Sequence, residues 1–568
     1  MKSSIPDFAD SVAGAIHNMS YSSPLRLSLL TLALLHATAA MAQQPPDAGR
    51  ILTEQAPELE LPKASPRFDF SIPLPDEPQP GGREVQLRSI TVSGNSLFSE
   101  EHLLTVLGEY EGRSFDLAGL RGLANQLTDY YHAAGYPFAR VFLPAQTLAD
   151  GALRLEVVEG RYGRVAAQGD PALAAQAQAF LARLQPGEVI ESRELERAAL
   201  ILSDQPGVHT TPLIRPGEKV GTGDLQVQVE RAERFSGAVG VDNHGNRYTG
   251  EHRGFVDLYA NSSFTFGDQL SLRALYSSEG MWFGNIDYSL PLGGSGLRAR
   301  VGYGHTYYEL GKEFAGLDAR GTAKVSSAGL SYPLLRSQRA NLGLSATYQH
   351  KQLRDEYRQA DVEQDKSSDS VPLSLQFDLR DSLAGGGVSF GAVTWTHGKL
   401  RLDSQLKLAD RLTAKTDGRF DKVNLDIARL QALPAGFSLY GRFSGQWSGD
   451  NLDSSEDFGL GGPGGVRAYP VGEGYGDQGW LTQVELRYAL GAFSPFVFHD
   501  SGRVRLVSNP WSDVNNHRSV SGAGAGVRFN QGAWQGEASV AWRTAGGDPE
   551  SDSRDRTPTV WARAQYSF

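Results

Sequence analysis

The chain has 568 residues, a formal net charge of −11 and no cysteine. Its length predicts more than one domain, unless one large β-barrel takes up much of it, and the missing cysteines fit an oxidising compartment. The acidic balance and the lack of a Lys/Arg block argue against a nucleic-acid partner, while 65 glycines with 10% aromatic residues favour turns and amphipathic strands over helical bundles.

Residues 1–42 are predicted to form a secretory signal peptide. Arg26 precedes an apolar run that ends in Ala-Met-Ala at 40–42, which has the A-x-A form of a cleavage site. A short buried helix is the alternative, but the charge before the run and the Gln-Gln-Pro-Pro sequence after it fit export better. Translation starts either at the first methionine or at Met19. No later run of about 18 apolar residues occurs, which leaves an exported soluble protein or a membrane β-barrel.

Residues 43–55 are predicted to form one short helix, with Ile51 and Leu52 as its apolar positions. The following segment, 56–84, is rich in proline and has little periodicity. Because proline blocks both helical and ladder hydrogen bonds, this segment is predicted to be an extended linker. A helix on such a tether could reach well away from the next domain.

Two consecutive segments, 85–160 and 162–231, have the same expected order of elements: strand, helix, helix, strand, strand. In the first segment, one helical pattern follows Ser99 and a second one starts at Asp116. Two units with one element order form a repeat. Each unit taken alone would be a small α+β domain.

From Phe235 to Phe568 the helical period disappears, and sixteen candidate strands follow one another. The stretch 373–379, for example, alternates leucine or phenylalanine with serine, glutamine and aspartate, so one face of the strand is wet. Short connectors alternate with longer polar segments, among them 351–370 and 397–419, which are predicted to be loops. This asymmetry, with an even strand count, is typical of an outer-membrane barrel. A soluble β-sandwich is the alternative, but it would not separate connector lengths so regularly.

The last predicted strand ends on the C-terminal residue. Tyr566 and Phe568 lie on its apolar face, while Trp561 and Arg563 lie on the other face. A terminal aromatic residue on the apolar face of a final strand resembles the signal that the outer-membrane insertion machinery reads. Tyr566 and Phe568 are therefore predicted to be a barrel insertion signal.

Enzyme and cofactor motifs lack a supporting context. Residues 387–391 match G-x-S-x-G, but they run into a strand rather than into the helix that a nucleophile elbow needs. The 12 histidines form no H-E-x-x-H, no cysteine is present for a structural zinc site, and no G-x-x-x-x-G-K-[ST] occurs. We therefore predict no catalytic residue, no metal and no cofactor, and expect the protein not to be an enzyme.

Residues 450–479, between the eleventh and twelfth strands, contain the decapeptide GGPGGVRAYP. A solvated loop whose glycines only permit turns is the simplest interpretation. Against it, Phe498 and Asp500 share the wet face of the thirteenth strand. Arg467 of the decapeptide can form a bidentate pair with a carboxylate, so we predict an Arg467–Asp500 pair in the lumen, worth about 1–3 kcal/mol. The glycines would give the loop its reach, and Tyr469 would pack beside the pair.

The sequence VRAY at 466–469 and the pattern Phe498-x-Asp500-x-Gly502 resemble the two signature motifs of the outer-membrane assembly superfamily. That superfamily joins periplasmic POTRA domains to a barrel with an inward-folded sixth extracellular loop. Two POTRA-like units behind a short helix and a proline-rich linker resemble the two-partner secretion transporters (TpsB), which include the haemolysin and filamentous-haemagglutinin transporters. The resemblance covers essentially the whole mature chain, and its supporting motif residues are Val466, Ala468, Tyr469, Phe498 and Gly502.

The family more often has glycine where Ala468 stands. The resemblance therefore implies a loop tip with slightly less backbone freedom than usual. Whether the alanine weakens the contact of Arg467 with Asp500 depends on what the extra methyl group meets.

The resemblance implies a membrane all-β barrel (235–568, with the long loop 450–479) of sixteen antiparallel strands, preceded by two periplasmic βααββ POTRA domains, 85–160 and 162–231. It implies an outer-membrane pore of a Gram-negative bacterium that secretes a large unfolded partner exoprotein of the haemolysin, adhesin or contact-dependent toxin type. The POTRA domains would recognise the N-terminal domain of this exoprotein. The helix at 43–55 would plug the pore at rest, and Arg467 and Asp500 would hold the sixth loop inside it.

Other expected partners are outer-membrane lipids, the barrel assembly machinery during biogenesis and periplasmic chaperones. An assembly factor for other outer-membrane proteins shares both motifs, but such factors usually have more POTRA units. A general porin needs neither POTRA domains nor a plug. An outer-membrane lipase would need a Ser–His pair on the outer wall, and no such pair has a supporting context.

Overall fold

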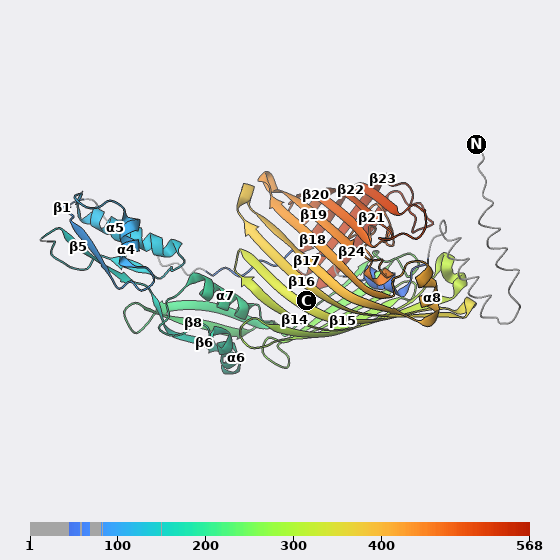
Figure 1. The fold of residues 1–568 in the computed structure, drawn as a ribbon, viewed down its shortest axis with the longest axis horizontal. Coiled ribbons are helices and arrows are strands. Elements are labelled where there is room, and N and C mark those ends of the chain that lie inside the picture. Colours follow the sequence, from blue (N-terminus) through green and yellow to red (C-terminus); the bar gives the residue numbers. More distant parts are fainter. Residues whose placement is uncertain (1–44, 57–58, 69–80, 82, 149) are drawn as a thin grey trace.

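The computed structural model describes residues 45–568 except 57–58, 69–80, 82 and 149. The predicted signal peptide, 1–42, therefore lies outside the described residues, and the predicted linker, 56–84, lies only partly within them. Two small α+β units precede a large barrel, and the short helix α3 (Ala48–Glu54) lies inside that barrel (Figure 1). Among the described residues, no helix combines the length and the apolar character needed to cross a membrane.

The first unit packs two helices on a three-stranded sheet in the order β2-β5-β4. Ser99 and Asp116 accept hydrogen bonds from the backbone N–H groups of His102 and Gly119, and so cap the starts of the two helices. The predicted first strand is split in two, because its beginning pairs with β3 instead of joining the larger sheet. The elements are β1 (Val85–Gln86), β2 (Ser89–Ser93), α4 (Glu100–Leu107), β3 (Ser114–Phe115), α5 (Leu117–Ala133), β4 (Arg140–Phe142) and β5 (Ala152–Val158).

The Glu159 side chain stabilises the end of the first unit. Its buried carboxylate accepts hydrogen bonds from the backbone N–H groups of Ser96 and Leu97 at 2.5 and 2.8 Å, and it pairs with Arg161 at 3.0 Å. Burial alone would raise the pKa of Glu159, but the hydrogen bonds from Ser96 and Leu97 and the charge of Arg161 outweigh it and lower the pKa below its usual value. The stabilisation is present above the ordinary carboxyl pKa and is lost as the pH falls through the lowered value.

Glu159→Gln is expected to destabilise the first unit by about 2–4 kcal/mol, because the neutral amide leaves Arg161 unpaired and turns charge-assisted bonds into weaker ones. The measurement is the urea concentration at which the unit becomes sensitive to protease in the full-length protein. The difference between the two proteins should shrink as the pH falls through the lowered pKa of Glu159. An exposed glutamate, Glu101→Gln, is the matched control. Equal protease resistance of the Glu159→Gln protein at neutral pH would contradict this role.

The second unit repeats the plan, with its sheet in the order β6-β8-β7. It also rests on the barrel, because Phe266 in a turn between barrel strands is part of its apolar core and lies 5.5 Å from Phe180, measured between ring centroids. The elements are β6 (Arg161–Gly169), α6 (Pro171–Ala177), a short 3-10 helix (Gln178–Leu181), α7 (Ser192–Ser203), β7 (Val208–Pro216) and β8 (Thr222–Arg231).

The barrel consists of sixteen antiparallel strands, β9 to β24, and β24 pairs with β9 to close it. This confirms the predicted fold class. Its strands are β9 (Phe235–Asp242), β10 (Arg253–Asn261), β11 (Gln269–Ser277), β12 (Trp282–Pro291), β13 (Arg298–Glu309), β14 (Ala319–Arg336), β15 (Ala340–Tyr357), β16 (Val362–Asp381), β17 (Gly387–Leu402), β18 (Gly418–Ala432), β19 (Phe437–Ser448), β20 (Gln478–Tyr488), β21 (Phe493–Arg505), β22 (His517–Gln531), β23 (Trp534–Ala545) and β24 (Thr559–Ser567).

The prediction of loops at 351–370 and 397–419 is wrong. Most of 351–370 belongs to β15 and β16, and 397–419 contains the ends of β17 and β18 together with the helix α8 (Ser404–Leu412). The ladders continue because backbone pairing does not need an apolar face. Beyond the membrane both faces of a hairpin are polar, so the alternation that marks a strand in the sequence disappears while the strand itself goes on.

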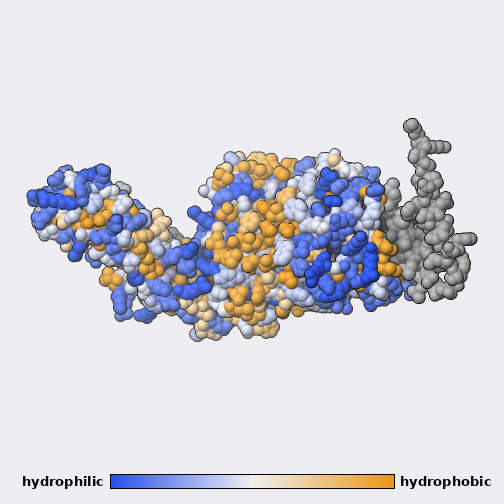
Figure 2. Space-filling view, viewed as in Figure 1, coloured by the Kyte–Doolittle hydropathy of each residue, from blue (hydrophilic) through white to orange (hydrophobic). Residues whose placement is uncertain are grey.

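The outward faces of the strands form an apolar band around the barrel. In β16 and β20, for example, Leu373, Leu375 and Val484 point outward with exposed fractions of 39%, 38% and 48%, while Glu485 on the inner face is 3% exposed. Figure 2 shows this band between the hydrophilic units on one side and a hydrophilic cap on the other. The chain enters β9 from the two units, so these mark one side of the membrane, and the segments after β9, β17 and β19 lie on the opposite, extracellular side.

Candidate functional site

The segment between β19 and β20 folds back into the barrel instead of standing in solvent. Val466, Ala468 and Tyr469 are at most 1% exposed, and they join an apolar cluster with Phe496 and Phe498 of the barrel wall. The turn before them needs glycine: Gly462 has a φ of +93°, and a Cβ at Gly465 would lie 2.7 Å from the Gly461 carbonyl oxygen. The glycines of the decapeptide therefore form the turn that presents Arg467 to the wall.

Arg467 and Asp500 form the predicted bidentate pair. The Arg467 Nε and Nη2 atoms lie 2.8 and 2.7 Å from the two Asp500 oxygens, and the Arg467 backbone N–H donates to the same carboxylate at 3.1 Å. The guanidinium carbon also lies 3.6 Å from the centroid of the Phe498 ring, which is a cation–π contact. Burial would lower the pKa of Arg467, but Asp500 and Glu485 raise it above its usual value, so the group stays charged.

A second carboxylate, which the sequence did not single out, completes the site. Glu485 of β20 accepts from Arg467 Nη1 at 2.6 Å and also pairs with Arg487 and Arg528 at 2.7 and 3.0 Å. The alternation along 482–490 puts Glu485 on the polar face of β20, opposite Val484 and Leu486. Only the register of β20 against β21 shows that this glutamate stands beside Phe498, next to Asp500. Breaking a buried pair of this kind costs about 3–5 kcal/mol, because it leaves an uncompensated charge in the wall.

The last two strands hold the backbone of the same turn. The indole N–H of Trp561 donates to the Arg467 carbonyl at 2.7 Å, and the Thr559 hydroxyl donates to the Ala468 carbonyl at 3.0 Å. The Tyr469 hydroxyl donates to the carbonyls of Ala545 and Gly547, both at 2.9 Å. The turn is thus fixed to β20 and β21 through side-chain charge and to β23 and β24 through neutral hydrogen bonds.

Ala468 is accommodated without strain. It is not among the residues with a positive φ, and its methyl group faces Gly522 of β22, where an added Cβ would clash with it. Gly502 in the neighbouring strand has a similar role, since a Cβ there would lie 2.7 Å from the Leu460 side chain of the loop. Gly522 therefore leaves room in the barrel wall for the methyl group of Ala468, so the expected loss of backbone freedom at Ala468 causes no clash.

Tyr566 and Phe568 lie away from this site, on the outer face of the barrel. They are 38% and 53% exposed, and the Tyr566 ring stacks edge-on against Trp534 at 5.0 Å. The Phe568 backbone exchanges hydrogen bonds with Gly237 of β9 at 2.8 and 2.9 Å, so the C-terminal residue helps to close the barrel. Their outward position agrees with an insertion signal, and that role stays a prediction.

Helix α3 is docked against the same loop. Asp47 caps the helix and accepts from Lys366 Nζ at 2.9 Å and from Ser454 Oγ at 2.7 Å. Lys366 also donates to Asp453 of the loop at 2.8 Å, so one lysine of β16 holds the helix and the loop together. Burial alone would raise the pKa of Asp47, but the charges of Lys366 and Arg50 and the Ser454 hydrogen bond lower it well below its usual value.

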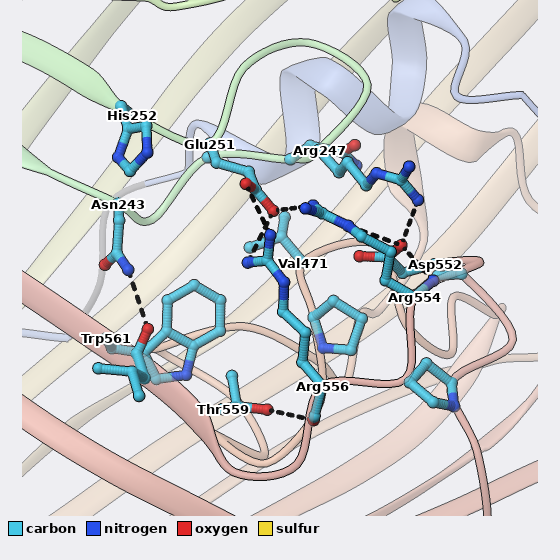
Figure 3. Close-up of a pocket in the computed structure, with 16 residues that line it drawn as sticks. Asn243, Arg247, Glu251, His252, Val471, Asp552, Arg554, Arg556, Thr559 and Trp561 are labelled. Carbon is cyan, nitrogen blue, oxygen red and sulfur yellow. Dashed lines mark hydrogen bonds and ion pairs between the residues drawn. The ribbon is translucent and has the colours of Figure 1, made fainter. Parts of the chain in front are cut away.

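The outer end of the loop is enclosed by neighbouring extracellular segments. A cavity of about 150 Å³ lies where Val471 of the loop meets the segments after β9 and before β24 (Figure 3). Its arginines are paired: Arg247 lies 2.7 Å from Asp552, and Arg556 lies 3.0 Å from Glu251. These pairs join the two segments across the closure between β24 and β9 and cover the loop from outside.

The end of the barrel nearest to the two units is stabilised by Arg336 at the end of β14. Its Nε and Nη2 atoms lie 2.7 Å from the two oxygens of Asp204 in the second unit, and its Nη1 atom donates to the Ser65 hydroxyl of the linker at 2.8 Å. The linker is also held by Arg380, which donates to the Pro62 carbonyl at 2.9 Å. One guanidinium therefore contacts the barrel, the linker and the second unit at once.

Comparison with known proteins agrees with this architecture. A family profile described as haemolysin secretion/activation protein ShlB/FhaC/HecB matches residues 221–529, and one for the ShlB-type POTRA domain matches residues 85–160. The heme/hemopexin transporter protein HuxB of Haemophilus influenzae (strain 86-028NP) is 28% identical over 539 residues, covering 90% of this chain and 94% of HuxB. The outer membrane transporter CdiB of Dickeya dadantii is 24% identical over 471 residues, covering 80% of this chain and 82% of that protein. The structure of CdiB from Escherichia coli has the same fold, with a TM-score of 0.71 at 20% identity over 97% of this chain and all 100% of that one.

Proposed function

The chain belongs to the haemolysin secretion/activation protein family ShlB/FhaC/HecB, and on this premise we propose that it exports one large partner protein through a pore controlled by helix α3 and the Arg467 loop. The protein is an outer-membrane transporter of the two-partner secretion type, with its barrel as the translocation pore and its two units in the periplasm. The predicted resemblance is therefore confirmed. The observation that carries the proposal is the joint docking of α3 and the loop in the lumen through Lys366, Asp47 and Asp453.

The domain bounds follow the same proposal. We place a signal peptide at 1–42, a plug segment at 43–55 and a linker at 56–84. Within the described part of the plug segment the helix spans only Ala48–Glu54, because Asp47 caps its start. Two POTRA domains follow at 85–160 and 162–231, before the barrel. The strand and helix bounds support this division, since each unit closes its own sheet before the next begins.

The periplasmic units are proposed to bind the partner by β-augmentation, in which an extended segment adds a strand to an open sheet edge. Three of the four edges have a backbone N–H satisfied by a side chain: Val92 of β2 donates to Glu100, Val141 of β4 to Thr128 and Ala167 of β6 to Gln178, each at 2.9 Å. The fourth edge, β7, carries two prolines, which cannot donate.

Strand β2 is the best candidate among these edges. The Ser89 backbone N–H donates to the Gly151 carbonyl within the sheet. Because the backbone groups of successive residues point to opposite sides of a strand, the N–H and C=O groups of Ile90 point toward the open edge. The Glu100 side chain, which covers this edge, is exposed to solvent and can change its rotamer to uncover it. An incoming strand would thus replace one charged side chain rather than a buried contact.

Passage is proposed to need no nucleotide, because a partner that folds irreversibly outside draws the remaining chain through the pore. We expect outer-membrane lipids, the barrel assembly machinery and periplasmic chaperones as further partners during biogenesis. An assembly factor for other outer-membrane proteins shares both motifs and is the alternative against which the transporter function is tested. The experiment that separates the two is secretion of the protein encoded beside this gene, in cells that carry the full chain or a chain without residues 85–231. Loss of secretion with normal levels of other outer-membrane proteins supports the transporter, and a general loss of outer-membrane proteins supports the assembly factor.

Arg336→Ala is expected to loosen the linker at the periplasmic mouth, because it removes the bidentate bond to Asp204 and the bond to Ser65 together. The chain has no cysteine, so a single one introduced in place of Leu59 reports on the linker alone, because this half-buried side chain packs against the barrel wall. Its reaction with a water-soluble maleimide should be about fivefold faster in the variant, as losing roughly 1 kcal/mol of restraint predicts. The matched control is Arg429→Ala, whose ion pair with Asp381 involves neither the linker nor the second unit. Equal rates in the two variants would contradict the role of Arg336.

A further inference from the structure

A row of outward apolar residues with two tryptophans marks the outer edge of the apolar band on β16 to β19. The register places Leu373, Trp395, Val423 and Trp447 side by side across these four strands. Trp395 and Trp447 are 47% and 45% exposed, so both rings point out of the barrel. Tryptophan is enriched where a barrel leaves the hydrocarbon, which makes this row the extracellular boundary of the lipid core.

Beyond this row, past His397 and Asp421, three cations point outward on two adjacent strands. Lys399 and Arg401 follow Trp395 on β17, and Arg419 precedes Val423 on β18; all three are exposed. We call these three residues the β17–β18 cationic patch. Within it, Lys399 and Arg419 are directly opposite one another in the ladder. Like charges in that position repel. On its other side Lys399 is directly opposite Asp369 of β16, so one carboxylate lies within reach of the patch.

Two carboxylates lie next to the patch, and one of them pairs with Arg401 of the patch. Asp369 accepts from the Tyr348 hydroxyl at 2.7 Å, contacts His350 Nδ1 at 2.7 Å and pairs with Arg401. Asp421 accepts from the Trp395 indole at 3.1 Å and contacts His397 at 3.0 Å. Within the part of the chain that the structure describes, the side chains of Lys399 and Arg419 form no hydrogen bond or ion pair.

We propose that the β17–β18 cationic patch binds the phosphate groups of lipid A, the phosphorylated glycolipid of the outer leaflet. Each step of two residues along a strand advances about 7 Å, and the three cations are four to six residues beyond the tryptophan row. With the strand tilt, the patch therefore lies roughly 10–15 Å beyond this row, at and beyond the level of the headgroups. Lysine and arginine side chains clustered at that level attract anionic headgroups. The patch faces away from the lumen, so an exported protein inside the pore does not meet it.

The test uses the full-length protein in detergent, titrated with bis-phosphorylated lipid A. We expect the variant Lys399→Gln/Arg401→Gln/Arg419→Gln to bind about 30-fold more weakly, because each charge contributes on the order of a fewfold to tenfold at a headgroup surface. Added salt should weaken binding by the native protein and have little effect on the variant. All three changes are at exposed outward positions, and heat-dependent gel mobility reports that the barrel has folded.

The matched control removes three exposed charges that lie apart from one another: Lys324→Gln on β14, Arg358→Gln in the turn after β15 and Arg503→Gln on β21. It should change binding less than threefold. An equal loss in both triple variants would overturn the proposal, because the attraction would then be diffuse. Undiminished binding of dephosphorylated lipid A, or equal binding of phosphatidylglycerol micelles, would also overturn it. So would a patch variant that secretes poorly yet binds lipid A normally, since the patch would then serve the exported protein.

Discussion

Secretion of the partner protein is expected to fall about a hundredfold when Arg467 is replaced by alanine, while the barrel still inserts. The variant leaves Asp500 and Glu485 without their shared cation in a buried wall, which costs about 3–5 kcal/mol and displaces the loop. The strand ladders do not involve the Arg467 side chain, so folding of the barrel should persist. The measurements are the partner in the culture medium, heat-dependent gel mobility of the transporter, and cleavage by chymotrypsin after Phe458, which packs against the buried cluster of Val466 and Tyr469 while the loop is docked.

Arg487→Ala is the matched control for this prediction. Arg487 also pairs with Glu485, at 2.7 Å, but it stands on β20 and does not hold the loop. We expect near-normal secretion and a protected loop in this variant. Arg467→Lys should fall between the two, because one ammonium group cannot bridge both carboxylates in the planar geometry of the guanidinium. Normal secretion by Arg467→Ala, or an equal loss in Arg487→Ala, would show that the pair does not act as a latch.

The Arg467–Asp500 contact could be predicted because each of the two residues lies in a short motif, and a guanidinium and a carboxylate can form a bidentate pair. A guanidinium on a glycine-rich loop and a carboxylate on a wet strand face are both visible in one sequence. Glu485 was not predictable in the same way, although its face was, because its distance from Arg467 depends on the register between β20 and β21. Register is fixed by the whole ladder, and no local pattern reports it.

The docking of α3 shows the same limit. Its predicted apolar positions were Ile51 and Leu52, and Ile51 is fully buried while Leu52 is partly buried against the same cluster. Its partners Lys366 and Asp453, however, are far away in the sequence and look like ordinary polar residues of long extracellular segments. The segment 351–370 was interpreted as a loop for a related reason: its strands are polar on both faces, so only the backbone ladder distinguishes them from coil. Sequence periodicity therefore predicted the elements that bury an apolar face and missed those held by charge or backbone pairing.

Gly49→Ala is expected to undock helix α3 and to hold the pore open. A Cβ at position 49 would lie 2.6 Å from the Ser455 backbone nitrogen and 3.0 Å from the Ser454 carbonyl carbon, and backbone atoms cannot move aside cheaply. The helix would have to shift by a large fraction of an ångström, which breaks the bonds of Asp47 to Lys366 and Ser454. In planar lipid bilayers the variant should show a larger fraction of open-channel time, by about tenfold if roughly 1.4 kcal/mol of docking free energy is lost.

The control for this change is Gly122→Ala, a glycine within helix α5 whose added Cβ would meet nothing within 4 Å. Both substitutions raise the intrinsic helix propensity by about 1 kcal/mol, so a difference between them reports packing against the loop rather than helix formation. Gly122→Ala should leave the resting conductance unchanged. Lys366→Ala should open the pore like Gly49→Ala, because it removes the charge that joins Asp47 to Asp453. If Gly49→Ala kept the resting conductance of the native protein while Lys366→Ala raised it, the lysine would act on the loop alone, and α3 would not be what closes the pore.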